Sequence, residues 1–230
     1  MIFLILVTVQ TFAQIQINNF GAGLSYWHRL YSGIDERAFL INYPGTAGNG
    51  IGALMPTVCA EVGLIQELSL EGRAGLWAST FTGEGTSADG AVILEEMDQR
   101  IIPLSIGAVY TFRHIVADIF NASVGIGINR YYIRNTMERT VFNAAGSMAP
   151  QVFTGNNLGL YGKAGIEYMI VPHLGLALEG RYNTGSYNQT QVTQPAANSV
   201  PTKVSLKGIE VGLVLRYSLF PMYGRSYRRY

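Results

Sequence analysis

Strict alternation of apolar and small polar residues is the feature that most constrains how this chain folds. Between Phe120 and Asn129, every even-numbered position holds Phe, Ala, Val or Ile, and every odd-numbered position holds Asn, Ser or Gly. Successive side chains of an extended strand point to opposite faces of a sheet. This segment therefore predicts a β-strand with one apolar face and one polar face.

The same period of two returns in seven more segments along the chain. They are residues 20–27, 57–64, 68–78, 102–111, 158–168, 174–182 and 209–217. Each is close to the ~9–11 residues that a tilted strand needs to cross a bilayer. An even number of antiparallel strands can close on itself and leave no unpaired edge in lipid. The expected fold class is all-β, an eight-stranded antiparallel up-and-down transmembrane β-barrel.

The connections between these segments alternate in length. The short ones are residues 65–67, 113–118 and 171–173, and the long ones are residues 32–52, 83–98, 135–157 and 185–203. Short turns at one end and long loops at the other are typical of outer-membrane barrels. The sequence thus predicts short periplasmic turns, long extracellular loops and both chain ends on the periplasmic side.

A soluble lipocalin-like barrel or sandwich, with its apolar face inward, would show the same alternation. Three observations favour the membrane: the polar face carries mainly Gly, Ser and charges of both signs, the apolar N-terminus predicts an export signal, and aromatic residues gather near strand ends, as interfacial girdles require. Charged residues are also only 13% of the chain, against ~25% in soluble domains. The predicted girdle residues are Phe20, Tyr26, Tyr31, Tyr110, Phe112, Tyr131, Tyr168, Tyr182 and Tyr217.

The N-terminus predicts a secretory signal peptide over residues 1–14. An apolar run from Met1 to Val9 is followed by the small residue Ala13, and we expect cleavage after Ala13 or Gln14. A short buried strand or helix is the alternative for this segment. After this segment the sequence has no run of 18 apolar residues, so no membrane-spanning helix is predicted. The barrel is expected over residues 15–220, followed by a short basic periplasmic tail over residues 221–230.

The polar face, turned inward, carries acids and bases in equal number. The acids are Glu61, Glu71, Glu167, Glu179 and Glu210, and the bases are Arg29, Arg73, Lys163, Arg181 and Arg216. Unpaired charge in a dehydrated interior is costly, so near-neutrality is expected. A barrel of eight strands is just wide enough for side chains to fill it. We expect a salt-bridge network that plugs the lumen, with inward glycines making room; a narrow polar path gated by these pairs is the alternative.

Two segments resemble a known group of proteins. Residues 210–217 read Glu-Val-Gly-Leu-Val-Leu-Arg-Tyr, which resembles the assembly signal in the last strand of bacterial outer-membrane proteins, and residues 171–182 are similar to the penultimate hairpin of small barrels. The chain thus resembles the OmpA-type, OmpX-type and opacity-protein-like superfamily. The signal usually ends the chain in that superfamily, whereas Ser218 to Tyr230 follow it here.

This resemblance implies an outer-membrane location and insertion by the barrel-assembly machinery. The expected partners are outer-membrane lipid and lipopolysaccharide, with an unidentified extracellular or periplasmic protein as a further candidate. The formal net charge of +1 gives no reason to expect nucleic acid. The basic, aromatic tail is either a disordered end or a contact for anionic headgroups.

Catalytic motifs are largely missing from the sequence. It has no nucleophile elbow, phosphate loop, His-Glu-x-x-His or EF-hand spacing, and the single Cys59 cannot form an internal disulfide. His28, near the outer end of its strand, is the one candidate general base, with Ser25 or Ser79 as nucleophile. A girdle histidine is the simpler interpretation, because His28 has lipid-facing parity. No catalytic, cofactor-binding or metal-binding residue is predicted.

Two of the long loops have distinctive compositions. The second carries five acids without a base, namely Glu84, Asp89, Glu95, Glu96 and Asp98, and the fourth, residues 185–203, is rich in Asn, Gln, Thr and Ser. The acids are either a solvated surface or ligands for a divalent ion that bridges lipopolysaccharide phosphates. A rigid scaffold that displays such loops is suited to recognition.

The function that these features predict is that of a non-enzymatic outer-membrane barrel, for envelope integrity or for loop-mediated surface binding and adhesion. One alternative is a narrow channel or transporter for small or apolar solutes, which needs a cavity among the inward glycines. The other is a lipid A-modifying enzyme that uses His28.

Overall fold

The computed structural model describes residues 16–31, 36–40, 51–65, 67–87, 89–116, 119–142, 148–190 and 201–220. The predicted signal peptide and the predicted C-terminal tail lie outside these residues. The described elements are β1 (Gln16–Arg29), the 3-10 helix η2 (Glu36–Phe39), β2 (Ile51–Ile65), β3 (Leu68–Gly75), β4 (Trp77–Thr86), β5 (Val92–Val116), β6 (Phe120–Val141), β7 (Met148–Val171), β8 (Leu174–Asn183), β9 (Ser186–Thr190), β10 (Pro201–Ser205) and β11 (Gly208–Ser218).

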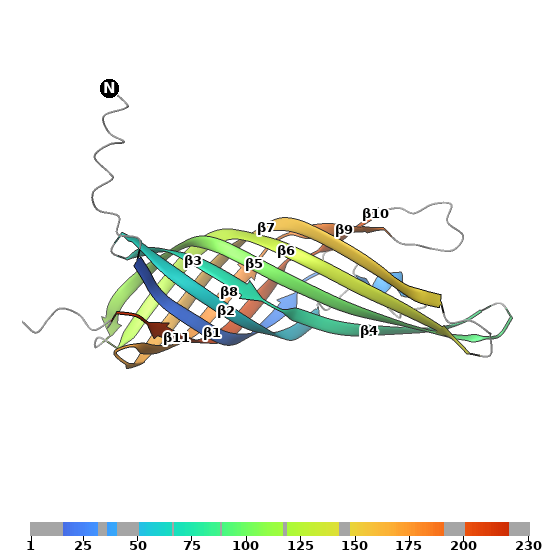
Figure 1. The fold of residues 1–230 in the computed structure, drawn as a ribbon, viewed down its shortest axis with the longest axis horizontal. Coiled ribbons are helices and arrows are strands. Elements are labelled where there is room, and N and C mark those ends of the chain that lie inside the picture. The colour runs from blue at the N-terminus through green and yellow to red at the C-terminus, as the bar shows by residue number, and fades with distance from the viewer. Residues whose placement is uncertain are drawn as a thin grey trace, which may run out of the picture.

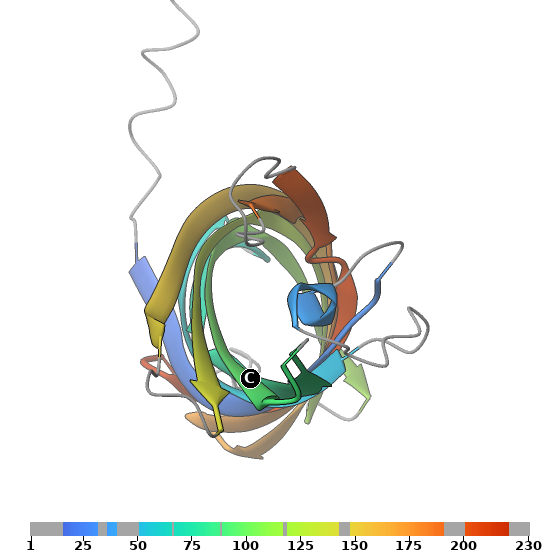
Figure 2. The ribbon, with the colours of Figure 1, turned by 90° about the vertical axis from the view of Figure 1, so that its right-hand side faces the viewer.

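All of these strands except β9 and β10 form one closed antiparallel barrel (Figures 1 and 2), and β9 and β10 pair with each other as a separate two-stranded sheet. The sheet runs in the order β3-β2-β1-β11-β8-β7-β6-β5-β4, and the additional pairing of β3 with β5 closes it. β3 and β4 both pair with β5, in continuous register on either side of Leu76, so they are one barrel strand with a single interruption. Counted in this way, the barrel has the predicted eight strands.

The alternation places the predicted faces correctly. In the described strands from β1 to β9 the inward side chains carry odd residue numbers, whereas in β10 and β11 they carry even numbers. The even-numbered apolar residues from Phe120 to Ile128 all point outward, and Ile126 is 67% exposed. We call the part of the barrel nearest the short turns its lower part and the opposite part its upper part. The exterior of the lower part is apolar, as a lipid environment requires.

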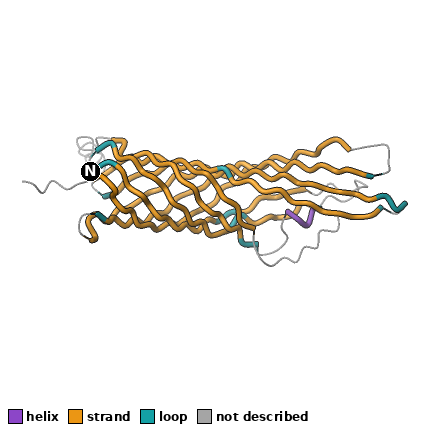
Figure 3. Tube along the Cα trace, turned by 90° about the horizontal axis from the view of Figure 1, so that it is seen from below, coloured by secondary structure: helices purple, strands orange, loops and turns teal. Residues whose placement is uncertain are grey.

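The short connections lie where the sequence predicts them, at the end of the barrel that also holds Gln16 and Ser218 (Figure 3). In the turn between β7 and β8, the ring of His173 lies 2.8 Å from the carbonyl oxygen of Ser218, measured from Nδ1, and stacks on Tyr217. This contact fastens the turn to the last strand. Among the described residues, no helix is long and apolar enough to span a bilayer.

The prediction of long loops at the other end is wrong for two of the four segments, residues 83–98 and 135–157. β5, β6 and β7 have 25, 22 and 24 residues, far more than a bilayer needs, and they continue as paired strands well beyond the apolar exterior. Most of residues 83–98 and 135–157 is therefore strand, and residues 185–203 contain the hairpin of β9 and β10. In Figure 1 the β4–β7 sheet projects to the right of the barrel.

The reason for this error is that the inward positions stay odd-numbered along each strand, while the apolar residues change from the outward positions to the inward ones. In the outer part of β5 the inward residues Met97 and Ile101 are apolar and buried, whereas the outward residues Asp98 and Arg100 are charged and exposed. Apolar residues thus move from even to odd positions along one strand. A search for one continuous apolar face stops at that point, although the strand does not.

The predicted aromatic girdle is wrong for two residues, Tyr131 and Tyr31. Tyr131 points inward and is fully buried, where its ring stacks on Trp27 with centroids 6.0 Å apart. Tyr31 likewise packs against buried residues of the lumen. The other girdle residues are exposed on the outside, namely Phe20, Tyr26, Tyr110, Phe112, Tyr168, Tyr182 and Tyr217.

Candidate functional site

The lower lumen holds a cluster of charged side chains, which we call the ionic layer. It consists of Glu61, Glu71, Arg73, Lys163, Glu167, Glu179, Arg181, Glu210 and Arg216, all of them buried. Each belongs to the inward parity of its strand, so the period-two pattern alone brings them together. The exterior at the same level is apolar.

Arg73 of β3 joins opposite sides of the barrel. Its Nη1 donates to Glu179 Oε2 at 2.7 Å, and its Nη2 donates to Glu210 Oε1 at 2.5 Å and to Ser25 Oγ at 2.7 Å. Its partners come from β8, β11 and β1, so one guanidinium connects four strands across the lumen. Such a multidentate arrangement is the geometry in which arginine surpasses lysine.

Arg216 and Lys163 complete the network. The Nη2 of Arg216 donates to Glu179 and, at 3.2 Å, to Glu71 Oε2, while its Nη1 lies 3.4 Å from Glu61 Oε2. The ammonium of Lys163 lies 2.5 Å from Glu71 Oε2. These carboxylates therefore share their cations, and no single ion pair is independent of its neighbours. This confirms the prediction of a salt-bridge network inside the barrel.

Inward glycines make the space for this network. A Cβ atom at Gly175 would lie 2.5 Å from Glu167 Oε1 and 2.9 Å from its Cδ, a separation that real Cβ contacts do not show. At Gly21 it would meet the Sγ of Cys59 at 2.7 Å and a Val214 methyl at 2.9 Å. The expectation that inward glycines accommodate long charged side chains is confirmed at Gly175.

One predicted member of the network lies elsewhere. Arg29, at the outer end of β1, pairs with Glu36 of η2, with 2.6 Å between Nη2 and Oε1. The ionic layer itself therefore holds five acids and four bases rather than five of each. Oε1 of Glu167 is buried there without a hydrogen-bond partner. Sequence reasoning missed Glu36 because nothing in its segment predicts that it enters the lumen.

Above the ionic layer, the lumen is filled by apolar and aromatic side chains, which we call the aromatic layer. It consists of Trp27, Phe39, Leu40, Met55, Trp77, Phe81, Met97, Ile101, Tyr131, Ile133, Tyr187, Val204 and Leu206. Both tryptophans of the chain belong to it, and their rings meet edge to face with centroids 6.1 Å apart. Figure 2 shows η2, which carries Phe39, lying inside the ring of strands.

A polar group sits at the centre of this layer. Oε1 of Glu36 accepts from Arg29, from Gln99 Nε2 at 2.9 Å and from the hydroxyl of Tyr187 at 3.0 Å. Gln99 also donates to Asn135 Oδ1 at 3.0 Å. Gln99 and Asn135 could be predicted by continuing the odd inward positions of β5 and β6 toward the upper end of the barrel. No periodicity in the sequence predicts that Glu36 or Tyr187 enters the lumen.

Charge pairing sets the state of Glu36. Burial by itself raises the pKa of this carboxyl group, but the Arg29 guanidinium and the hydrogen bond from Gln99 lower it by more. The net result is a pKa below the ordinary value of a glutamate. Glu36 is thus ionised at neutral pH and attaches η2 to the barrel wall.

The structure does not bring His28 together with Ser25 or Ser79, as the enzymatic alternative requires. Ser25 points into the lumen and accepts from Arg73, whereas His28 has outward parity and stacks on Tyr26, with ring centroids 6.4 Å apart. Ser79 has inward parity as well. His28 therefore lies on the opposite face of the sheet from both candidate nucleophiles, as a girdle histidine would.

The acidic segment predicted between β4 and β5 also differs. Glu95 is buried and forms an ion pair with Arg139 of β6, whose Nε donates to it at 2.6 Å. Glu84, Glu96 and Asp98 lie on the exposed face of the sheet, and Asp89 lies at the hairpin tip. No group of three or more acidic, histidine or cysteine side chains that could hold a metal ion occurs within the part of the chain that the structure describes.

A closed barrel of eight strands with an apolar exterior and a charged interior is a transmembrane β-barrel of the outer-membrane type. No family model and no curated protein matches the sequence. Among solved structures, the outer membrane protein OprG from Pseudomonas aeruginosa matches 89% of this chain and 97% of its own, with a TM-score of 0.57 and 14% identity. At that identity the likeness shows a shared fold.

Two further solved structures match with lower TM-scores. Outer membrane protein W of E. coli covers 90% of this chain and 100% of its own at a TM-score of 0.40 and 17% identity. Ail, the attachment invasion locus protein of Yersinia pestis, covers 88% and 98% at a TM-score of 0.47 and 8% identity. Both are small barrels, and neither likeness is close enough to support an argument about this chain.

Proposed function

We propose that this protein is a non-enzymatic barrel of the outer membrane that displays its projecting sheet for binding at the cell surface. One observation carries the proposal: β4, β5, β6 and β7 remain paired far beyond the apolar exterior, up to Thr86 with Val92 and Arg139 with Met148. A paired sheet holds its exposed side chains in fixed positions, which lowers the entropic cost of recognition.

The filled lumen supports the same proposal. The ionic layer closes the lower part and the aromatic layer closes the upper part, so the described side chains leave the outer surface as the region suited to binding. Insertion by the barrel-assembly machinery and contact with lipopolysaccharide are part of this proposal. Heat-modifiable migration on a gel, together with fractionation with outer membranes, tests the location.

Shortening the sheet tests the binding role. Thr82 pairs with Glu96 and Met137 pairs with Gln151, so removing residues 83–95 or residues 138–150 and joining each pair through Asn-Gly preserves the register. We expect both variants to fold, and to lose adhesion of expressing cells to surfaces coated with fibronectin, collagen or heparin. Retained adhesion, or adhesion absent from the wild type, would contradict surface binding.

Envelope integrity is the other part of the predicted function. Cells that express the shortened variants also distinguish envelope integrity from surface binding. A strain that lacks the chain would then become sensitive to detergent and to large antibiotics, and both shortened variants would restore its resistance. The barrel alone is sufficient for that role. Loss of adhesion without a change in resistance assigns the projecting sheet to binding.

A second candidate function, passage of a small apolar solute, is favoured by one observation. β2 pairs with β3 only up to Thr57 and Gly75, and no ladder joins the outer part of β2 to β4 in the described strands. Met55 and Trp77 of the aromatic layer lie on the two sides of this seam. Proteoliposome uptake of an apolar dye, faster in Trp77→Ala, supports this candidate, whereas uptake at the rate of empty liposomes rejects it.

A further inference from the structure

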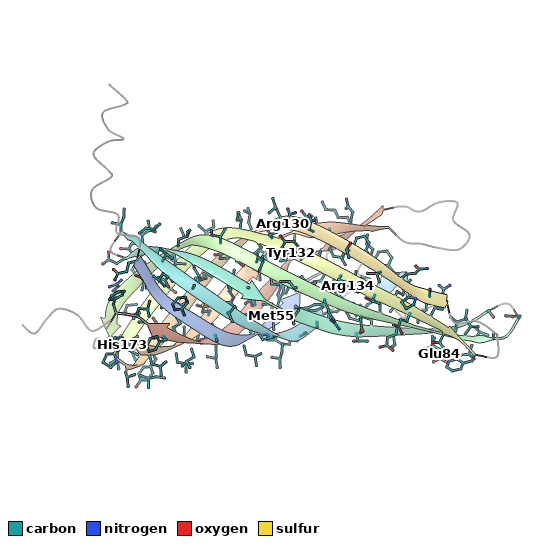
Figure 4. The ribbon with its side chains drawn as sticks, in the orientation of Figure 1. Met55, Glu84, Arg130, Tyr132, Arg134 and His173 are labelled. Atoms are coloured by element: carbon teal, nitrogen blue, oxygen red, sulfur yellow. The ribbon has the colours of Figure 1, made fainter. Side chains whose placement is uncertain are left out.

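Three arginines gather on the outside of the barrel, where the apolar exterior ends. Arg100 of β5 lies directly opposite Arg134 of β6, and Arg130 follows four pairs further down, opposite Leu104. Tyr132 lies between the two arginines of β6, and Figure 4 shows these three side chains along its outer face. We call Arg100, Arg130 and Arg134 the exterior arginine patch.

The patch marks the boundary between two kinds of surface. On β5, the outward residues below Arg100 are Ile102, Leu104 and Ile106, all exposed and apolar. Above it, the outward residues are Asp98 and Glu96. The arginines thus occupy the level at which a lipid surrounding the barrel changes from acyl chain to headgroup.

None of the residues that the structure describes neutralises the charges of the patch. Like charges directly opposite on paired strands are destabilising, yet neither Arg100 nor Arg134 forms an ion pair with any residue that the structure describes. Asp98, the next outward residue on β5, accepts from the hydroxyl of Thr80 at 2.6 Å. Arg130 donates to Asn156 Oδ1 at 2.6 Å and lies 5.9 Å from the ring centroid of Tyr132, which fixes its position but leaves its charge.

We propose that the exterior arginine patch binds the phosphate of an outer-leaflet lipid, a phosphorylated and acylated saccharide. Guanidinium groups bind phosphate oxygens through paired hydrogen bonds, and two of them facing each other can share one phosphate. The acyl chains of the same molecule would lie along Ile102, Leu104 and Ile106. This inference rests on the proposed location in the outer membrane and adds a specific lipid site to it.

The apolar surface below the patch favours a lipid over free phosphate. A soluble anion would gain only from the arginines, which water and salt screen at an exposed site. A lipid gains in addition from burying its chains against the strand surface, at about 25 cal/mol per Å². The patch thus suits a ligand with a charged head and apolar chains.

Native mass spectrometry of the full chain, refolded in detergent micelles, tests the proposal. The probes are bisphosphorylated lipid A, the same lipid with its phosphates removed, and inorganic phosphate as a competitor. The variants are Arg100→Ala/Arg134→Ala and Arg100→Lys/Arg134→Lys. The matched control is Lys207→Ala, which removes a single exposed cation near Leu30, the residue that follows β1, away from the patch.

We expect bisphosphorylated lipid A to bind the wild type and the Lys207→Ala control alike, and to bind the double alanine variant roughly tenfold more weakly. The double lysine variant keeps the charge without the planar fork and should fall between them. Equal binding by the double alanine variant, equal binding of the lipid without phosphates, or complete competition by inorganic phosphate would each overturn the proposal.

A folding control separates this inference from the proposed function. If the wild type gives no heat-modifiable band in lipid, the proposed membrane barrel fails and the lipid site fails with it. If the wild type and both double variants fold and migrate alike while their lipid binding is equal, only the lipid site fails.

Discussion

The lower and upper halves of the lumen are built on opposite chemical principles. Where the outside of the barrel is apolar near the short turns, the inside is the ionic layer; where the outside of β5 and β6 becomes charged, the inside is the aromatic layer. The lower half follows the rule of membrane barrels, with apolar residues toward lipid. The upper half follows the rule of soluble sheets, with apolar residues toward the core and polar residues toward water. One set of strands satisfies both rules by exchanging the chemistry of its two faces.

This difference implies two sources of stability in one barrel. The ionic layer has no gain from removing apolar surface from water, so its stability depends on pairing every buried charge. The aromatic layer has that gain and depends on close packing instead. Each half should therefore respond to a different kind of substitution.

The largest effect is expected from removing the central cation of the ionic layer. Arg216→Met leaves Glu61, Glu71 and Glu179 short of positive charge, and loss of one partner of a buried pair costs about 3–5 kcal/mol. Urea titration in detergent micelles, followed by heat-modifiable migration, measures the loss. Adding Glu179→Gln should recover part of it, and a double variant less stable than Arg216→Met would contradict charge balance as the cause.

A somewhat smaller loss is expected from opening the aromatic layer. Trp77 is fully buried, so Trp77→Ala should reduce the free energy of unfolding by about 3 kcal/mol, near the lower end for such truncations because water can enter from the open end. The same titration measures it. Trp77→Phe should recover most of the stability. An apolar replacement in the ionic layer should not recover stability in this way. An unchanged midpoint in Trp77→Ala would mean that the upper lumen is not packed.

The exchange of the two faces can be tested from the outside. Ile106→Arg places a charge in the middle of the apolar exterior and should cost about 2–4 kcal/mol in a bilayer. Thr136→Arg makes a cation at an outward position of β6 above the exterior arginine patch and should be nearly neutral. Folding yield and unfolding free energy in lipid vesicles give the comparison. Equal costs at both positions would show that the membrane boundary lies elsewhere.

The smallest effect concerns the attachment of η2. The folded-state pKa of Glu36 is lowered, so its contribution to docking is complete at neutral pH and is lost as the pH falls through that lowered value. Acid should thus expose the tryptophans, since Arg29 lies 5.1 Å from the ring centroid of Trp77.

Acrylamide quenching of tryptophan emission against pH measures this opening. Both tryptophans of the chain lie in the aromatic layer, so the signal has no other source. Glu36→Gln should raise quenching already at pH 7, corresponding to about 1.5–3 kcal/mol for a hydrogen bond to a charged group, and should abolish the acid transition. A transition of equal size in this variant would assign it to other carboxylates.

The lower half of the molecule was predictable from sequence and the upper half was not. Within the bilayer, one apolar face per strand and one inward parity are enough to place nine charged residues in one layer. Beyond the bilayer the alternation remains, but the apolar residues move from even to odd positions, so the pattern predicts loops in segments such as 83–98, which are mostly strand. The error in Tyr131 has the same origin, because an aromatic residue near the boundary can belong to the exterior girdle or to the aromatic layer.

Side chains that enter the lumen from the connections between strands are the second feature that the sequence pattern does not predict. The inward parity of Arg29 predicts that it joins the ionic layer, but its partner Glu36 comes from a short helix whose position no periodicity encodes. Gln99 and Asn135 were within reach of parity reasoning, since both lie at odd positions of long strands.

The constant parity of the strands also restricts how related sequences can differ in length. Inward positions are odd from β1 to β9 and even in β10 and β11, so the change falls between Gln189 and Val204. A single residue inserted inside a strand would turn its outer part inside out, sending charges to lipid and isoleucines to the ionic layer. Insertions and deletions of odd length are therefore expected to accumulate in connections, as between β9 and β10, and to be purged from the strands during evolution.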